Sequence, residues 1–89
     1  MEIKIKKESK KEMEFEVIYE KTILNPLKQK LLEYDEVEMA EWTIPHPLTA
    51  NPEFYVRVSK GNVREIVKKA IDDIQKDLND MLQQLEEHQ

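Results

Sequence analysis

Hydrophobic and charged residues alternate along the first part of the chain with the period of two that is typical of β-strands. Ile3 and Ile5 share one face of residues 2–7, and the residues between them are charged. Residues 12–19 alternate in the same way, and the polar run between the two segments predicts a turn. We therefore expect an antiparallel hairpin with an apolar inner face and a charged outer face, as in a sheet covered on one side only.

After this hairpin the pattern changes to the period of a helix. Asn25 is of a type that caps helices, and Pro26 suits a first helical turn because the N–H that it lacks is not needed there. These residues predict a short helix over about residues 26–34. Leucines at helical spacing define its apolar side: Leu24, Leu27, Leu31 and Leu32.

Residues 37–44 and 53–59 predict two further strands on either side of a proline-rich loop. The first of the two carries bulky apolar residues on both faces, so either both faces are buried or the strand lies at an exposed edge. The loop contains three prolines, which preclude a regular strand or helix interior. We expect this stiff segment, Pro45-His46-Pro47-Leu48, to be ordered by contact, with Leu48 buried against the domain or a partner.

The strongest pattern in the chain is the C-terminal segment. Gly61 ends the preceding strand, and Asn62 followed by Glu65 has the spacing of a capping box, with Asn in place of the usual Ser or Thr. No glycine or proline interrupts the segment from residue 63 onward, which predicts a helix over residues 63–87. Its apolar residues recur at gaps of one, three and four: Val63, Ile66, Val67, Ala70, Ile71, Ile74, Leu78, Met81, Leu82 and Leu85.

A helix of this length matches or exceeds the rest of the domain. At about 1.5 Å per residue it is about 37 Å long, whereas a compact domain of this size is roughly 30 Å across. Its last apolar residues should lie near or beyond the edge of the sheet, and fully burying each is worth roughly 1.5–3 kcal/mol. The simplest solution is a second helix, from a partner, that covers them. Two alternatives stay open, namely that the last turns fray or fold back on the same molecule, or that the helix pairs with a second copy.

These elements predict a single domain over residues 1–89 with an α+β fold. We expect a four-stranded antiparallel sheet with two helices on one face, in the order strand, strand, helix, strand, strand, long helix. Val63, Val67 and Ala70 should face the sheet. The expected partner-facing surface combines both helices: Leu24, Leu27, Leu31, Ile74, Leu78, Met81 and Leu85.

Composition narrows the possible functions. The 89 residues carry a net charge of −5, which argues against direct, specific binding to nucleic acid, although lysines cluster near the N-terminus. The chain has no cysteine, and hence no disulfide or thiolate metal site. No long apolar run is present, so we expect a soluble, cytoplasmic protein without a membrane span.

Candidate catalytic chemistry is sparse. His46 is the one histidine in the expected folded part, and no base, nucleophile or ligand set accompanies it at a recognisable spacing. A single glycine, Gly61, provides no glycine-rich phosphate loop. We therefore expect no catalytic residue, cofactor or metal. His46, like Asn25, Pro26, Pro47, Leu48, Gly61 and Asn62, is interpreted as structural.

Two segments resemble a known family. Thr22-Ile23-Leu24-Asn25-Pro26-Leu27 is similar to the helix-opening segment of the α-like small subunits of RNA polymerase, with Lys21 where a histidine is usual. Ile44-Pro45-His46-Pro47-Leu48 resembles the His-Pro-Leu segment that follows the third strand in that family. The order of elements is also the same, and the resemblance covers essentially the whole chain.

This resemblance implies the subunit L family of archaeal DNA-directed RNA polymerases, counterparts of the small α-like subunit of the eukaryotic enzymes. It implies a non-catalytic assembly subunit that pairs with the larger α-like subunit, called D in archaeal polymerases. The pair would then be the platform for the large catalytic subunits and other small assembly subunits. Two other functions are considered, namely a homodimeric or other-partner scaffold unrelated to transcription, and a small enzyme or metal protein centred on His46.

Overall fold

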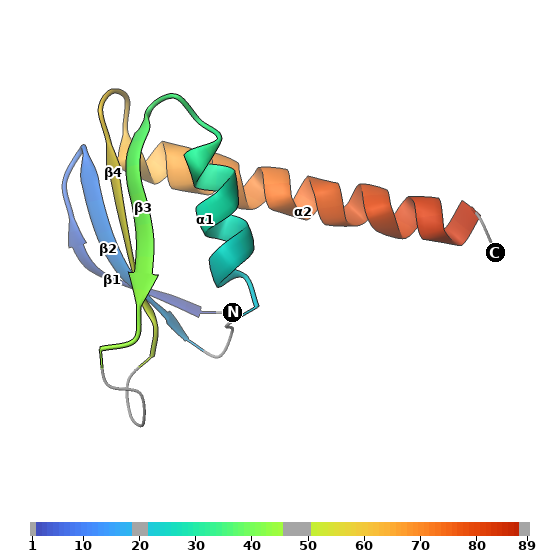
Figure 1. Ribbon diagram of the computed structural model, residues 1–89, viewed down its shortest axis with the longest axis horizontal. Coiled ribbons are helices and arrows are strands. Elements are labelled where there is room, and N and C mark those ends of the chain that lie inside the picture. Colours follow the sequence, from blue (N-terminus) through green and yellow to red (C-terminus); the bar gives the residue numbers. More distant parts are fainter. Residues whose placement is uncertain (1, 19–21, 46–50, 88–89) are drawn as a thin grey trace.

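The computed structural model describes residues 2–18, 22–45 and 51–87, and these form one antiparallel sheet and two helices (Figure 1). The expected order of elements and the α+β class are confirmed, and each strand ends within about a residue of its expected position. The elements are β1 (Glu2–Glu8), β2 (Glu12–Ile18), α1 (Leu24–Leu32), β3 (Val37–Thr43), β4 (Glu53–Val58) and α2 (Val63–Glu87).

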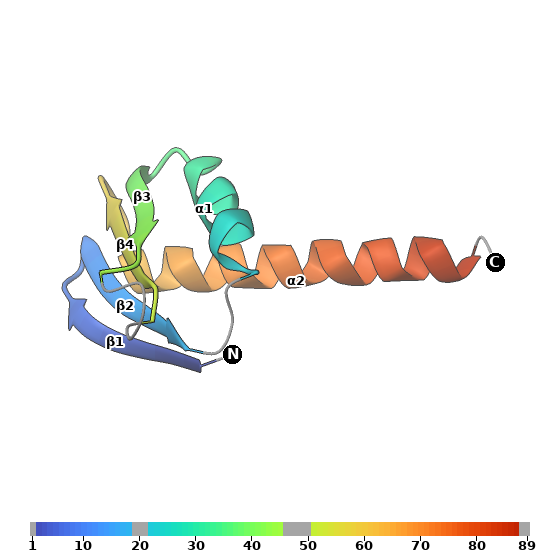
Figure 2. The ribbon, with the colours of Figure 1, turned by 60° about the horizontal axis from the view of Figure 1, so that its bottom comes forward.

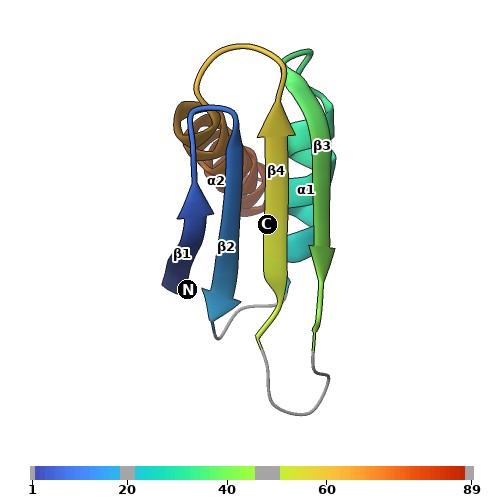
Figure 3. The ribbon, with the colours of Figure 1, turned by 90° about the vertical axis from the view of Figure 1, so that its left-hand side faces the viewer.

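The strands lie in the order β1-β2-β4-β3, with every neighbouring pair antiparallel. Both helices lie behind the same face of the sheet, with α1 behind β3 and β4 (Figure 3). This arrangement confirms the prediction that both helices lie on the apolar face of the sheet. At the centre of that face the rings of Phe15 and Phe54, which are register partners on β2 and β4, stack with centroids 5.3 Å apart.

β3 is an edge strand, which accounts for its bulky residues on both faces. Its register with β4 shifts between Val37 and Met39. This irregularity changes the alternation, so that Val37, Ala40 and Trp42 all belong to the core or pack against it. The sequence allows either a strand buried on both faces or a strand at an exposed edge, and the structure shows the edge strand.

The first helix begins earlier than expected, and Asn25 does not cap it. α1 starts at Leu24, and the preceding Ile23 has helical backbone angles and no capping side chain. The Asn25 side chain instead accepts a hydrogen bond from the indole nitrogen of Trp42, at 3.1 Å. Pro26 is therefore the third residue of α1, still within the first turn, where its missing N–H costs no helical hydrogen bond.

The start of α2 agrees with the sequence. Gly61 has φ = +82°, a left-handed conformation that residues with a Cβ rarely adopt. The Asn62 side-chain oxygen then accepts from the backbone N–H groups of Arg64 and Glu65, at 2.9 and 3.4 Å. The predicted cap is confirmed, although its shorter bond is to Arg64 rather than to the expected Glu65.

α2 runs away from the sheet instead of lying flat across it (Figures 1 and 2). Its first two turns are buried at Val63, Ile66, Val67 and Ala70, so the three residues expected to face the sheet are in the core. Ile71 and Ile74 still pack against the core, and beyond Asp77 the helix stands clear of the body. The molecule measures 45 Å along its longest axis. The sequence pattern indicates the excess length of the helix but not this direction.

Candidate partner-binding surface

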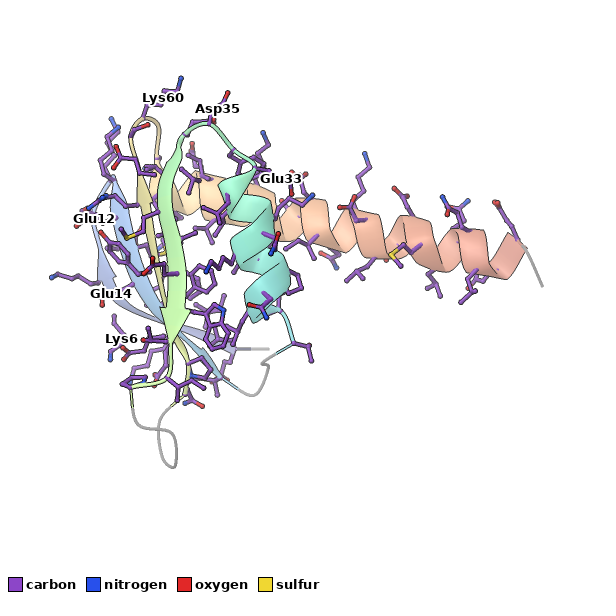
Figure 4. All side chains as sticks on the ribbon, viewed as in Figure 1. Lys6, Glu12, Glu14, Glu33, Asp35 and Lys60 are labelled. Carbon is purple, nitrogen blue, oxygen red and sulfur yellow. The ribbon has the colours of Figure 1, made fainter. Side chains whose placement is uncertain are left out.

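The far half of α2 carries an exposed row of apolar side chains, which we call the α2 stripe. Four of its members are more than half exposed, with relative exposures of 60% for Leu78, 67% for Met81, 56% for Leu82 and 71% for Leu85. Ile74, the first member, is half-buried and packs against the core. Figure 4 shows the side chains of this part of α2 standing free of every other element. The stripe is therefore exposed in the isolated chain, as the helix-length argument predicts.

The leucines of α1 do not extend this surface. Leu24, Leu27 and Leu31 are 2%, 2% and 0% exposed, and they belong to the core of this chain. The prediction that they face a partner together with α2 is wrong in this respect. The reason is geometric: α1 has nine residues and one apolar side, and that side packs into the core of this chain beside β3 and α2. Only Leu32, at 52%, presents an α1 leucine to solvent.

Polar contacts fix α1 against α2 at the point where α2 leaves the core. The Tyr34 hydroxyl donates to the Asp73 carboxylate at 2.6 Å, and the Lys30 ammonium lies 3.2 Å from the Asp77 carboxylate. Burial, together with the bond to Asp73, raises the pKa of Tyr34 above its ordinary value. The Lys69 ammonium also lies 5.0 Å from the centre of the Tyr34 ring. Together these contacts set the direction in which the α2 stripe projects.

A second exposed apolar region lies between β1 and α2, and we call it the β1 groove. Ile3 and Ile5, on the inner face of β1, remain 38% and 41% exposed. The groove has a volume of about 360 Å³ and an apolar floor, and charged residues of α2 stand at its rim. Its lining residues are Ile3, Ile5, Met13, Phe15, Arg64, Val67, Lys68, Ile71 and Asp72.

The β1 groove and the α2 stripe lie on one continuous helix face. Val67 and Ile71 line the groove, and Ile74 and Leu78 follow Ile71 by three and by seven residues. Residues three and four apart are neighbours on a helix surface, so each of these side chains adjoins the next. The sequence interpretation assigns Ile3 and Ile5 to a covered inner face and so misses the groove. The sequence carries no signal for the groove, because the groove depends on the direction in which α2 leaves the sheet (Figure 2).

An ion pair involves Arg64, one of the residues that line the groove. The β1 strand has a register irregularity between Ile5 and Lys7, after which Glu8 pairs with the buried Met13. The Glu8 carboxylate accepts from the Arg64 guanidinium at 2.7 Å. This hydrogen bond holds the pKa of Glu8 below its ordinary value. The bond joins β1 to the first turn of α2 beside the groove.

The outer face of the sheet is polar and internally paired. Lys6, which Figure 4 labels with Glu12 and Glu14 on the sheet side, forms an ion pair with Glu53. Tyr55 donates to Glu12 at 2.7 Å, and Arg57 pairs with Glu38 at 3.0 Å. The N-terminal lysines thus belong at least in part to a charged solvent face.

The described residues present exposed apolar surface and no candidate metal site. In residues 2–18, 22–45 and 51–87, no group of three or more His, Asp or Glu side chains is placed to hold a metal ion. The same part of the chain has no helix long and apolar enough to cross a membrane. His46, Pro47 and Leu48, which the sequence singles out as structural, lie outside the described residues. Fold and surface together define a class: a small α+β domain whose long second helix projects from the body and carries exposed apolar side chains.

The comparison with protein families agrees with this class. The family described as RNA polymerase Rpb3/Rpb11 dimerisation domain matches residues 12–84. The chain belongs to this family. The resemblance found in the sequence is thereby confirmed.

Similar curated proteins are subunits of archaeal RNA polymerases. The DNA-directed RNA polymerase subunit Rpo11 of Archaeoglobus fulgidus is 41% identical over 64 residues, which are 72% of this chain and 74% of that one. Subunit Rpo11 of Thermoplasma acidophilum is 35% identical over 63 residues, 71% of this chain. That match spans 57% of the relative, less than two thirds of its length.

A solved structure shares the whole fold. The crystal structure of DNA-directed RNA polymerase subunit L from Thermoplasma acidophilum superposes with a TM-score of 0.85 at 28% sequence identity. The superposition covers 98% of this chain and 87% of the other. These relatives do not support the interpretation as a scaffold unrelated to transcription.

Proposed function

We propose that this chain is a non-catalytic assembly subunit of a cytoplasmic DNA-dependent RNA polymerase. It heterodimerises with the larger α-like subunit of that enzyme, and the pair forms the platform for the large catalytic subunits and the other small subunits. The family and the named relatives support a role in the polymerase. The observation that carries the proposal is the α2 stripe, since four large apolar side chains stand in solvent on a helix that leaves the body.

Burial of the stripe by a partner has a clear energetic advantage. Each large apolar side chain gains roughly 1.5–3 kcal/mol when it is fully removed from water. The β1 groove adds apolar area on the same helix face, so a partner helix on the stripe can also reach Ile3 and Ile5. The stripe and the groove thus form one continuous exposed apolar surface, and such a surface on a small protein is typical of a protein–protein interface.

The test is a single substitution in the stripe. Leu78→Glu would place an unpaired carboxylate in the apolar interface, at a cost of several kcal/mol. We expect the variant to lose co-purification with the larger α-like subunit when the two are co-expressed from genes of the same genome. Because Leu78 is 60% exposed in the free chain, the far-ultraviolet circular dichroism of the isolated variant should stay unchanged.

The matched control is Gln83→Glu, which makes the same change of charge. Gln83 lies five residues after Leu78, and at 3.6 residues per turn this places it on the opposite side of α2. We expect it to bind the larger α-like subunit as the wild type does. Equal binding by Leu78→Glu would refute a role for the stripe, and unfolding of the isolated Leu78→Glu variant would show that the stripe is intramolecular core.

A further inference from the structure

The charged residues beside the α2 stripe indicate which kind of partner surface is electrostatically complementary to it. Residues 77–87 contain four carboxylates, at Asp77, Asp80, Glu86 and Glu87, and no lysine or arginine. Asp77 lies four residues before Met81, and Glu86 lies four residues after Leu82. Side chains four apart are neighbours on a helix, so one carboxylate borders the stripe on each side.

The helix itself disfavours this distribution of charge. The C-terminal end of a helix carries a partial negative charge, which favours cations and disfavours carboxylates. α2 has no basic residue in its last turn, and Glu86 and Glu87 lie there instead. A cation supplied from outside would offset both the carboxylates and the end of the helix.

The contact between α1 and α2 within this chain shows what such a complement looks like. α1 packs its leucines against the core, and Lys30 and the nearby Tyr34 contact Asp77 and Asp73, the acidic residues of α2 that face them. Farther along α2, acidic residues recur, but no lysine or arginine of the described residues pairs with them. Asp80, Glu86 and Glu87 are exposed and have no ion pair within the described residues. Of these three, Glu86 borders the stripe, whereas Asp80 and Glu87 lie toward the opposite side of α2.

We propose that the α2 stripe selects a partner helix whose apolar face is bordered by lysine or arginine, and that its acidic border disfavours pairing with a second copy. If two copies paired through their stripes, residues 77–87 of one copy would face residues 77–87 of the other. This segment contains no lysine or arginine, so its carboxylates would meet no cation there in either a parallel or an antiparallel pair. Like charges across an interface suppress the wrong pairing, and opposite charges fix the right one. This inference rests on the proposed function, because it describes the partner of the same stripe.

The test compares two adjacent charge reversals, Glu86→Lys and Glu87→Lys. Both change the net charge by the same amount, but Glu86 borders the stripe, whereas Glu87 lies toward the opposite side of α2. An exposed ion pair contributes a factor of about 1.4 to 5 in affinity, and reversal also adds repulsion. We expect Glu86→Lys to weaken binding to the purified larger α-like subunit about fivefold or more, and Glu87→Lys to change it less than about twofold.

Two further measurements complete the test. The dissociation constant of the wild type with the larger α-like subunit, measured by titration calorimetry, should rise on the order of fivefold between about 50 and 500 mM NaCl, and less steeply for Glu86→Lys. Sedimentation of the wild type alone should show weaker self-association than that of the neutral variant Glu86→Gln.

The results separate the inference from the proposed function. Tight wild-type binding that neither salt nor Glu86→Lys alters would overturn the charge selection and leave the heterodimer intact. Self-association of the wild type as tight as its binding to the larger α-like subunit would overturn the selection as well. Absence of wild-type binding to that subunit even at low salt would overturn both.

Discussion

At the scale of single residues, local chemistry is readable from the sequence at some positions and hidden at others. Gly61 and Asn62 can be identified from their types and neighbours, because a left-handed turn and a helix cap depend on adjacent backbone alone. Asn25 cannot, because its hydrogen-bond partner, Trp42, is 17 residues away. Nothing in the sequence around Asn25 reveals that the two meet.

The Asn62 cap leads to a direct prediction. Asn62→Ala removes the acceptor of two backbone N–H groups at the start of α2 and should lower the free energy of unfolding by about 0.5–2 kcal/mol. Asn62→Asp keeps an oxygen in place and serves as the control, with a stability near that of the wild type. Urea unfolding followed by circular dichroism measures both. Equal stability of the Ala and Asp variants would show that the cap contributes nothing.

At the scale of elements, hydrophobic periodicity predicts every described helix and strand but not the neighbours of each. The periodicity of α1 is correct, yet it assigns to a partner three leucines that belong to the core of this chain. A stripe of apolar residues shows that a helix face is covered and does not show by what. The register irregularities of β1 and β3 are also invisible in the sequence, since an extra residue in one strand is defined only by its pairing with another.

The two helices should respond differently to the same truncation. Leu27→Ala opens a cavity in the core and should cost about 2–5 kcal/mol of stability in the isolated chain. Leu78→Ala removes the same atoms from an exposed position and should change the stability by less than about 0.5 kcal/mol. Urea unfolding of the free chain compares the two variants. A similar loss in both would mean that the far half of α2 is packed in the free chain.

At the scale of the whole molecule, the excess length of α2 is the decisive feature of the sequence. A length of about 37 Å indicates that the helix outruns the domain, and the structure shows it projecting from the covered face of the sheet (Figure 2). The direction of that projection depends on contacts such as Tyr34 with Asp73, between elements distant in sequence. The β1 groove likewise exists only once the four strands and two helices are placed together.

The central claim is that the α2 stripe and the β1 groove form one surface that a partner covers. Hydrogen–deuterium exchange of the chain, alone and in complex with the larger α-like subunit, tests it most directly. The exposed helix of residues 78–87 should exchange fast in the free chain, because few tertiary contacts hold it. In the complex, exchange should slow strongly over residues 78–87 and over β1, while β3, at the opposite edge of the sheet, stays as it was. Unchanged exchange over residues 78–87, with new protection confined to β3, would contradict the account.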